Sequence, residues 1–112
     1  MGQEPIAIVG RGCVVPDACD PDTFWENIAA GRCSLSSIED GGCVRDFDAA
    51  FDACGFTVSA AEIMVLDPLY RWVLHAARQA LREAGRGSGP LPGAGLVLGN
   101  LSYPSAGLAR FA

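Results

Sequence analysis

The sequence predicts an α/β fold, because short unbroken apolar runs are separated by stretches with helical periodicity. Residues 6–9 and 96–98 contain no polar side chain, which is typical of strands buried on both faces of a sheet. Half of the 112 residues are hydrophobic and the mean hydropathy is +0.25, which argues against a disordered chain. This length allows at most one domain.

The first predicted helix follows the Asp20-Pro21 pair. Aspartate is a strong N-cap residue, and proline is well tolerated in the first helical turn. Gly31 is placed to end the helix, since glycine readily adopts the left-handed conformation found after helix C-termini. The predicted apolar stripe consists of Phe24, Trp25, Ile28 and Ala29.

Two short helical stretches are predicted next. Phe47 and Phe51 stand four residues apart, so they share one face of a helix. Ser59 and Glu62 have the spacing of a capping box, in which each side chain bonds the backbone N–H of the other residue. A helix is therefore expected to begin after Ser59.

The clearest predicted helix covers residues 68–84, with Asp67-Pro68 at its start and Gly85 after its end. We expect its apolar stripe to face a sheet, with Trp72 and Leu81 among the most buried side chains, and Arg78 to lie on the exposed side. The stripe comprises Leu69, Trp72, Val73, Ala76, Ala77, Ala80, Leu81 and Ala84.

The charge balance and the N-terminus exclude several classes of function. A formal net charge of −5 and a pI near 4.6 leave no basic footprint for nucleic acid or for an anionic membrane. Residues 1–5 include an acid in place of the basic start of a signal peptide, and no apolar run approaches membrane-spanning length. We therefore expect a soluble, cytoplasmic protein that contacts neither nucleic acid nor membrane.

The cysteines and the single histidine do not form a recognisable site. The cysteines stand at positions 13, 19, 33, 43 and 54, without a C-x-x-C pair. An odd count and wide spacing favour reduced thiols over disulfides or a metal centre. His75 falls among the polar positions of the long helix, so an exposed or boundary histidine is expected. Gly10 and Gly12 resemble the start of a dinucleotide fingerprint, but Val15 occupies the third glycine position, which favours a structural turn.

Three ordered strings resemble the opening of β-ketoacyl synthase domains of polyketide and multifunctional fatty-acid synthases. They are residues 4–13 with Pro16, residues 24–28 with 30–32, and residues 47–51 followed by Ser59, Glu62, Asp67, Pro68, Arg71 and residues 80–85. The tail, residues 95–104, looks most like synthases of the polyunsaturated-fatty-acid type. The resemblance covers residues 4–34 and 46–105. Residues 33–46 depart from the family pattern, which is longer there.

The resemblance implies a partial thiolase-like fold, the N-terminal portion of an α-β-α-β-α sandwich, with residues 1–112 as one N-terminal fragment of the domain. The complete family enzyme is a dimer. It condenses acyl and malonyl thioesters that are carried on the phosphopantetheine of an acyl carrier protein, with the rest of the synthase as further partner. The family's catalytic cysteine and two histidines lie beyond Ala112, and Cys13 matches a structural cysteine. No catalytic, cofactor-binding or metal-binding residue is therefore assigned, and the chain alone is expected to be inactive.

Two alternatives stay open at this stage. The same scaffold would suit a stand-alone module that docks carrier protein or a synthase partner. A small nucleotide- or redox-active α/β protein is the third hypothesis. The ordered family strings favour the synthase fragment over both.

Overall fold

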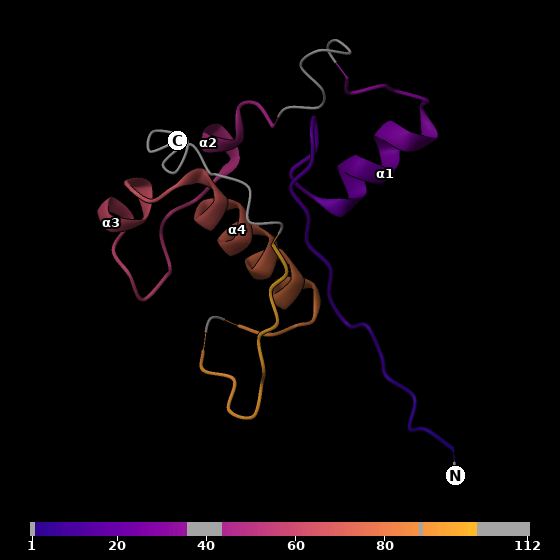
Figure 1. Ribbon diagram of the computed structural model, residues 1–112, viewed down its shortest axis with the longest axis vertical. Coiled ribbons are helices and arrows are strands. Elements are labelled where there is room, and N and C mark those ends of the chain that lie inside the picture. Colours follow the sequence, from indigo (N-terminus) through magenta and orange to yellow (C-terminus); the bar gives the residue numbers. More distant parts are fainter. Residues whose placement is uncertain (1, 36–43, 88, 101–112) are drawn as a thin grey trace.

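The computed structural model describes residues 2–35, 44–87 and 89–100, and four helices account for its regular structure. In chain order these are α1 (Pro21–Ala29), α2 (Phe47–Ala50), α3 (Ala60–Met64) and α4 (Pro68–Glu83). Figure 1 shows α2 and α3 beside the first turns of α4, with α1 set apart from them and the N-terminal segment running away from the helices. Each helix begins where the sequence predicts it.

Side-chain caps fix the starts of the two longer helices. The Asp20 carboxylate accepts hydrogen bonds from the backbone N–H and the hydroxyl of Thr23, at 2.8 and 2.7 Å. Asp67 accepts from the backbone N–H of Leu69 at 2.9 Å. Both contacts satisfy amide donors that have no partner inside a helix, and both aspartates are followed by a proline in the first turn. The predicted N-caps are confirmed.

The core lies where α2 and α3 meet α4. Its buried members are Phe47, Phe51 and Ile63, of which Ile63 is 1% exposed. The rings of Phe47 and Phe51 stack at a centroid distance of 5.4 Å, although α2 ends at Ala50 and Phe51 lies in extended backbone just after the predicted helical face. Ser59 and Glu62 form the predicted capping box at the start of α3 and so fix the turn that brings Ile63 into this core. Partly buried apolar residues complete the cluster: Val14, Cys19, Val44, Ala53, Phe56, Trp72 and Leu74.

The two predicted strands do not form within the described part of the chain. Residues 6–9 and 96–98 have no ladder partner there, and Ile6 and Val97 are each 96% exposed. An isolated antiparallel bridge joins Val15 to Ala18 instead. A strand that is buried on both faces needs a neighbouring strand for its backbone groups and a covering layer for its side chains. Neither run meets such neighbours in these ranges.

The prediction that the apolar stripe of α4 would be the buried face is wrong in this structure. Leu81 is 37% exposed and Trp72 is only partly buried, whereas Arg71 is 8% exposed and the Arg78 side chain is 15% exposed. The reason is that the segment between α2 and α3 packs on the polar side of α4, while no sheet covers the apolar side among the described residues. The stripe of α1 is likewise uncovered, with Trp25 67% exposed.

The molecule is accordingly more extended than a closed domain. Its radius of gyration is 16.5 Å, whereas a compact domain of about 100 residues has roughly 13 Å. The exposed apolar runs and the exposed apolar face of α1 are consistent with this difference. None of the helices in the described ranges has both the length and the apolar character needed to cross a bilayer.

Candidate functional site

The N-terminal loop is seated directly on the backbone of α4. A side chain at Gly10 would overlap the carbonyl group of Ala80, and one at Gly12 would overlap that of Ala76. Both glycines are therefore required for close approach of two backbones. They do not face an open helix N-terminus that could receive a phosphate, which agrees with the structural interpretation of this Gly-x-Gly pair.

Polar contacts lock the same loop onto α4. The Arg11 guanidinium forms an ion pair with Glu83 at 2.5 Å, and the Arg11 backbone N–H also donates to that carboxylate. The side-chain hydrogen bond from Arg11 lowers the pKa of Glu83 below its usual range. Two residues after Arg11 in the loop, the backbone N–H of Cys13 donates to Oε1 of Gln79 at 3.1 Å. These bonds hold the loop along the last two turns of α4.

His75 is a structural residue in this arrangement. Its Nε2 lies 2.7 Å from the carbonyl oxygen of Cys19, and its ring meets that of Phe47 edge-on at 5.3 Å. Gln79 lies beside it and donates to the same Cys19 carbonyl. His75 is half-buried, as expected for a boundary residue, and its hydrogen bonds within the described ranges go to no nucleophilic side chain.

The nearby thiols lack the environment of a catalytic cysteine. Burial raises the pKa of both Cys13 and Cys19, and the Asp20 carboxylate adds to this effect. A nucleophilic cysteine needs the opposite shift, because the thiolate is the reactive form. The four cysteines in the described ranges, Cys13, Cys19, Cys33 and Cys54, are free thiols. Cys43 lies outside the described residues. In the described ranges no three His, Cys, Asp or Glu side chains come close enough together to hold a metal ion.

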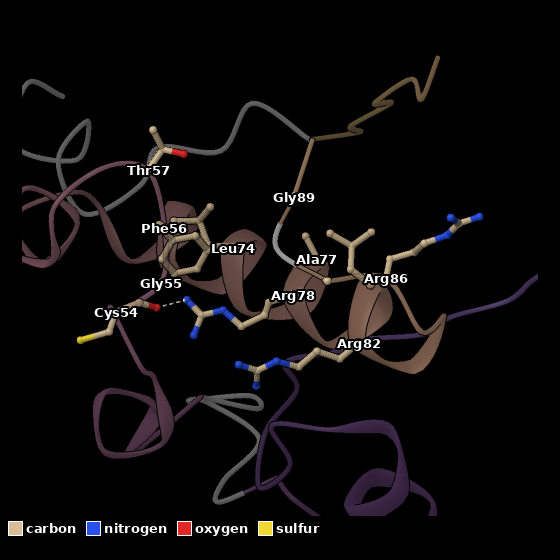
Figure 2. A pocket seen from close by; sticks show the side chains of 12 residues that line it. Cys54, Gly55, Phe56, Thr57, Leu74, Ala77, Arg78, Arg82, Arg86 and Gly89 are labelled. Carbon is tan, nitrogen blue, oxygen red and sulfur yellow. Dashed lines mark hydrogen bonds between the residues drawn. The ribbon is translucent and has the colours of Figure 1, made fainter. Parts of the chain in front are cut away.

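A pocket of about 460 Å³ lies beside the C-terminal half of α4, against the segment between α2 and α3. Figure 2 shows Arg78 extending from α4 to the carbonyl group of Cys54, with Phe56 and Leu74 next to it. Arg78 donates to the carbonyl oxygens of Asp52 and Cys54 at 2.7 and 3.0 Å, and its guanidinium lies 3.8 Å from the ring centre of Phe56.

The pocket combines an apolar floor with three arginines. Arg78 and Arg82 lie on neighbouring turns of α4, and Arg86 follows after the helix end at Gly85. The apolar lining comes from Phe56, Leu74, Ala77 and Leu81. The sequence predicts Arg78 on the exposed side of the helix and indicates no pocket. The four-residue arginine spacing is visible in the sequence, but the segment that closes the pocket is not.

The comparisons with known proteins identify the family. The family model described as β-ketoacyl synthase, N-terminal domain, matches residues 3–102. The chain is 33% identical over 106 residues to a phenolphthiocerol/phthiocerol polyketide synthase protein of Mycobacterium tuberculosis, covering 73% of the chain and 7% of that protein. It is 35% identical over 107 residues to the highly reducing polyketide synthase PKS6 of Gibberella zeae, covering 73% and 4%.

A third relative extends this match along the chain. Another protein of the same Mycobacterium tuberculosis synthase is 30% identical over 126 residues, covering 89% of the chain and 7% of the relative. The chain thus spans less than a tenth of the length of these relatives. No solved structure matches it significantly. The resemblance noted in the sequence is confirmed, and the chain belongs to the β-ketoacyl synthase family, where it corresponds to part of the N-terminal domain.

Proposed function

We propose that this chain acts as the N-terminal part of a β-ketoacyl synthase domain in a polyketide synthase. The complete domain would condense acyl and malonyl thioesters held on the phosphopantetheine of an acyl carrier protein. The observation that carries this proposal is the family match over residues 3–102, together with relatives that are named as polyketide synthases. The partners would be the carrier protein and the rest of the synthase, with a second copy in a dimer.

The described residues would contribute scaffold and no catalytic group. Gly10 and Gly12 seat the first loop on α4, while His75 and the Cys13 and Cys19 thiols serve packing. Residues 6–9 and 96–98 would form strands of a thiolase-like sheet once further strands flank them. Their lack of polar alternation and their exposure support this part of the proposal. We assign no cofactor-binding or metal-binding residue, and we treat residues 1–112 as one unit of the domain.

The comparisons favour this function over a stand-alone docking module. The match follows the synthase domain in order from residue 3 to residue 102, as expected for a segment of that domain. The close backbone contacts of Gly10 and Gly12 with α4 suit a scaffold element within such a domain. No observation favours a nucleotide-binding function.

The first test is an assay of the 112-residue chain with acyl and malonyl thioesters on carrier protein. We expect no 3-oxoacyl product above background, because the structure offers no low-pKa thiol paired with an imidazole in the described ranges. Sustained release of carbon dioxide with a 3-oxoacyl product, both lost in Cys13→Ala, would contradict the scaffold role.

The second test asks whether the segment supports catalysis inside a complete domain. Residues 3–102 replace the matching segment of the synthase domain in the 33%-identical Mycobacterium tuberculosis relative, and condensation by the chimera is measured. We expect activity to be retained and to be lost in the Gly12→Val chimera, since that side chain would meet the carbonyl group of Ala76. Gly87→Val, at a position with open space around it, is the matched control. A soluble dimeric chimera without activity would argue against the proposed function.

A further inference from the structure

We propose that the pocket beside the C-terminal half of α4 binds a small amphipathic organic anion, whose phosphate or carboxylate head pairs with Arg82 and whose apolar part lies on Leu81 and Phe56. This proposal goes beyond the proposed function, and binding by the 112-residue chain tests it separately from condensation.

The concentration of positive charge in the pocket is unusual for this chain. Three of the eight arginines line it, although the chain as a whole carries a net charge of −5 and contains no lysine. Arg78 and Arg82 form one like-charged i, i+4 pair on α4, an arrangement that by itself disfavours the helix, and Arg86 follows just beyond the helix end. Burial and the neighbouring Arg82 charge lower the pKa of Arg78.

The three arginines differ in whether their guanidinium groups already have partners within the protein. Arg78 donates to two backbone carbonyls and lies on Phe56, so it forms a fixed wall. Arg82 and Arg86 form no salt bridge within the described residues, and both side chains are exposed. Figure 2 shows Arg82 extending in the same direction as Arg78, whereas Arg86 points away from them. Arg82 is therefore the available donor for a bound oxyanion, flanked by the fixed charge of Arg78.

The helix end holds the far side of the pocket in place. The backbone N–H of Arg86 donates to the carbonyl of Leu81 at 2.8 Å, and that of Gly85 donates to the carbonyl of Arg82 at 3.0 Å. With Gly85 at a φ of +69°, this is the Schellman arrangement that ends a helix. It fixes the chain after α4 against the pocket and brings Arg86 to its rim, so the cavity exists before a ligand arrives.

Size and polarity indicate the class of ligand. A volume of about 460 Å³ lies within the range of small-molecule sites, roughly 300–1,000 Å³. The aromatic and aliphatic floor suits an apolar body, and the planar guanidinium of Arg82 suits an oxyanion. The Asp52 carboxylate lies 3.8 Å from the Arg78 guanidinium and accepts a hydrogen bond from the backbone of Cys54. Its negative charge interacts with both Arg78 and Arg82, so it competes electrostatically with an incoming anion.

The test is calorimetric titration of the 112-residue chain with octyl phosphate and octanoate, with inorganic phosphate and octanol as half-ligand probes. We expect either amphipathic anion to bind about tenfold or more tightly than the half-ligands, and its affinity to fall as salt is added. The octyl phosphate and octanoate arms distinguish a phosphate head from a carboxylate head.

Four single variants sharpen this test, because each changes one charge. Arg82→Gln is expected to weaken binding about tenfold or more, in line with the loss of a charge-assisted hydrogen bond. Arg86→Gln should weaken it only a few-fold, since that side chain points away. Asp52→Asn should tighten binding, because it removes the competing carboxylate and keeps an oxygen for Cys54. Arg32→Gln, after the end of α1, is the matched control and should leave binding unchanged.

Unchanged affinity in Arg82→Gln, or equal losses in Arg82→Gln and Arg32→Gln, would overturn the proposal. Absence of binding by the unaltered chain would also overturn it. A third possibility is that the arginines only stabilise the negative end of the α4 dipole. In that case Arg82→Gln would lower the helical dichroism and leave the affinity for octyl phosphate unchanged, which would count against a binding site.

Discussion

The central segment, residues 44–84, buries an apolar core, whereas the two apolar runs at residues 6–9 and 96–98 leave their side chains exposed. The central segment folds onto itself, with helices that start at their own caps and a core in which Ile63 is 1% exposed. The two runs are as hydrophobic as that core, yet Ile6 and Val97 are 96% exposed. Helical backbone bonds are satisfied within the segment, whereas a strand depends on a neighbour. Hydrophobicity alone therefore does not bury a segment whose backbone lacks partners.

The largest expected effect comes from breaking the core of the central segment. Phe47→Ala should destabilise the chain by about 3–5 kcal/mol, because it removes a 5%-exposed ring and leaves a cavity between Phe51 and His75. Urea unfolding followed by near-ultraviolet dichroism measures this difference. The control is Leu96→Ala, an equally apolar site that is 78% exposed, for which we expect almost no change. Similar losses for both variants would erase the contrast between the two regions.

The next effect concerns Arg78, which the sequence predicts to be a neutral surface position. Its two hydrogen bonds to backbone carbonyls and its contact with Phe56 tie the segment between α2 and α3 to α4. We expect Arg78→Ala to cost about 1–3 kcal/mol, since two carbonyls lose a charged donor. Arg82→Ala, on the next turn and on an exposed side chain, is the matched control. Equal and negligible effects would restore the original prediction.

Much of the local structure was predictable, and the reason is visible at the caps. Asp20, Asp67 and the Ser59–Glu62 pair specify helix starts through contacts within three residues, so the sequence contains the whole interaction. The burial of Arg71 and Arg78 was not predictable in this way. It depends on Asp48 in α2 and on the carbonyls of Asp52 and Cys54 in the loop after α2, which lie 23 to 26 residues away along the chain.

The difference between local contacts and contacts between distant segments also explains which features of the candidate site the sequence predicted. The incomplete phosphate motif predicts a structural turn at Gly10 and Gly12, whereas their close approach to the α4 backbone is visible only in the structure. The arginine pocket required knowledge of which side of α4 the loop at Phe56 would cover. Two members of the predicted apolar stripe, Ala77 and Leu81, line the pocket, but the stripe alone does not indicate that a loop bearing Phe56 lies beside them.

A smaller effect is expected at the cap of α1, where stability should depend on pH. The hydrogen bonds from Thr23 lower the pKa of Asp20 below its usual value. A carboxyl group with a lowered pKa stabilises the folded state above its unfolded pKa, about 3.9, and loses that contribution as the pH falls through the folded pKa. Asp20→Ala should therefore cost about 1 kcal/mol at neutral pH. The loss, measured as helical dichroism and urea midpoint, should shrink below about pH 4. A loss that does not change with pH would contradict the cap.

Lysine substitutions in the two exposed apolar runs are expected to change the unfolding free energy least. They nevertheless test the contrast between the two regions most directly. Ile8 and Val97 are 87% and 96% exposed, so lysine at either position removes no packing within the described residues. Unpaired apolar edges favour pairing between chains, and lysine is a residue that natural edge strands use against such association. We expect the unaltered chain to self-associate in size-exclusion chromatography with light scattering. The Ile8→Lys, Val97→Lys double variant should shift towards monomer with its urea midpoint unchanged. Glu26→Lys at an exposed position of α1 also makes the net charge more positive by two, so it is the control for charge. If the unaltered chain is a monodisperse monomer with a sharp cooperative melt, the runs must find partners within the chain itself, and the contrast between the two regions disappears.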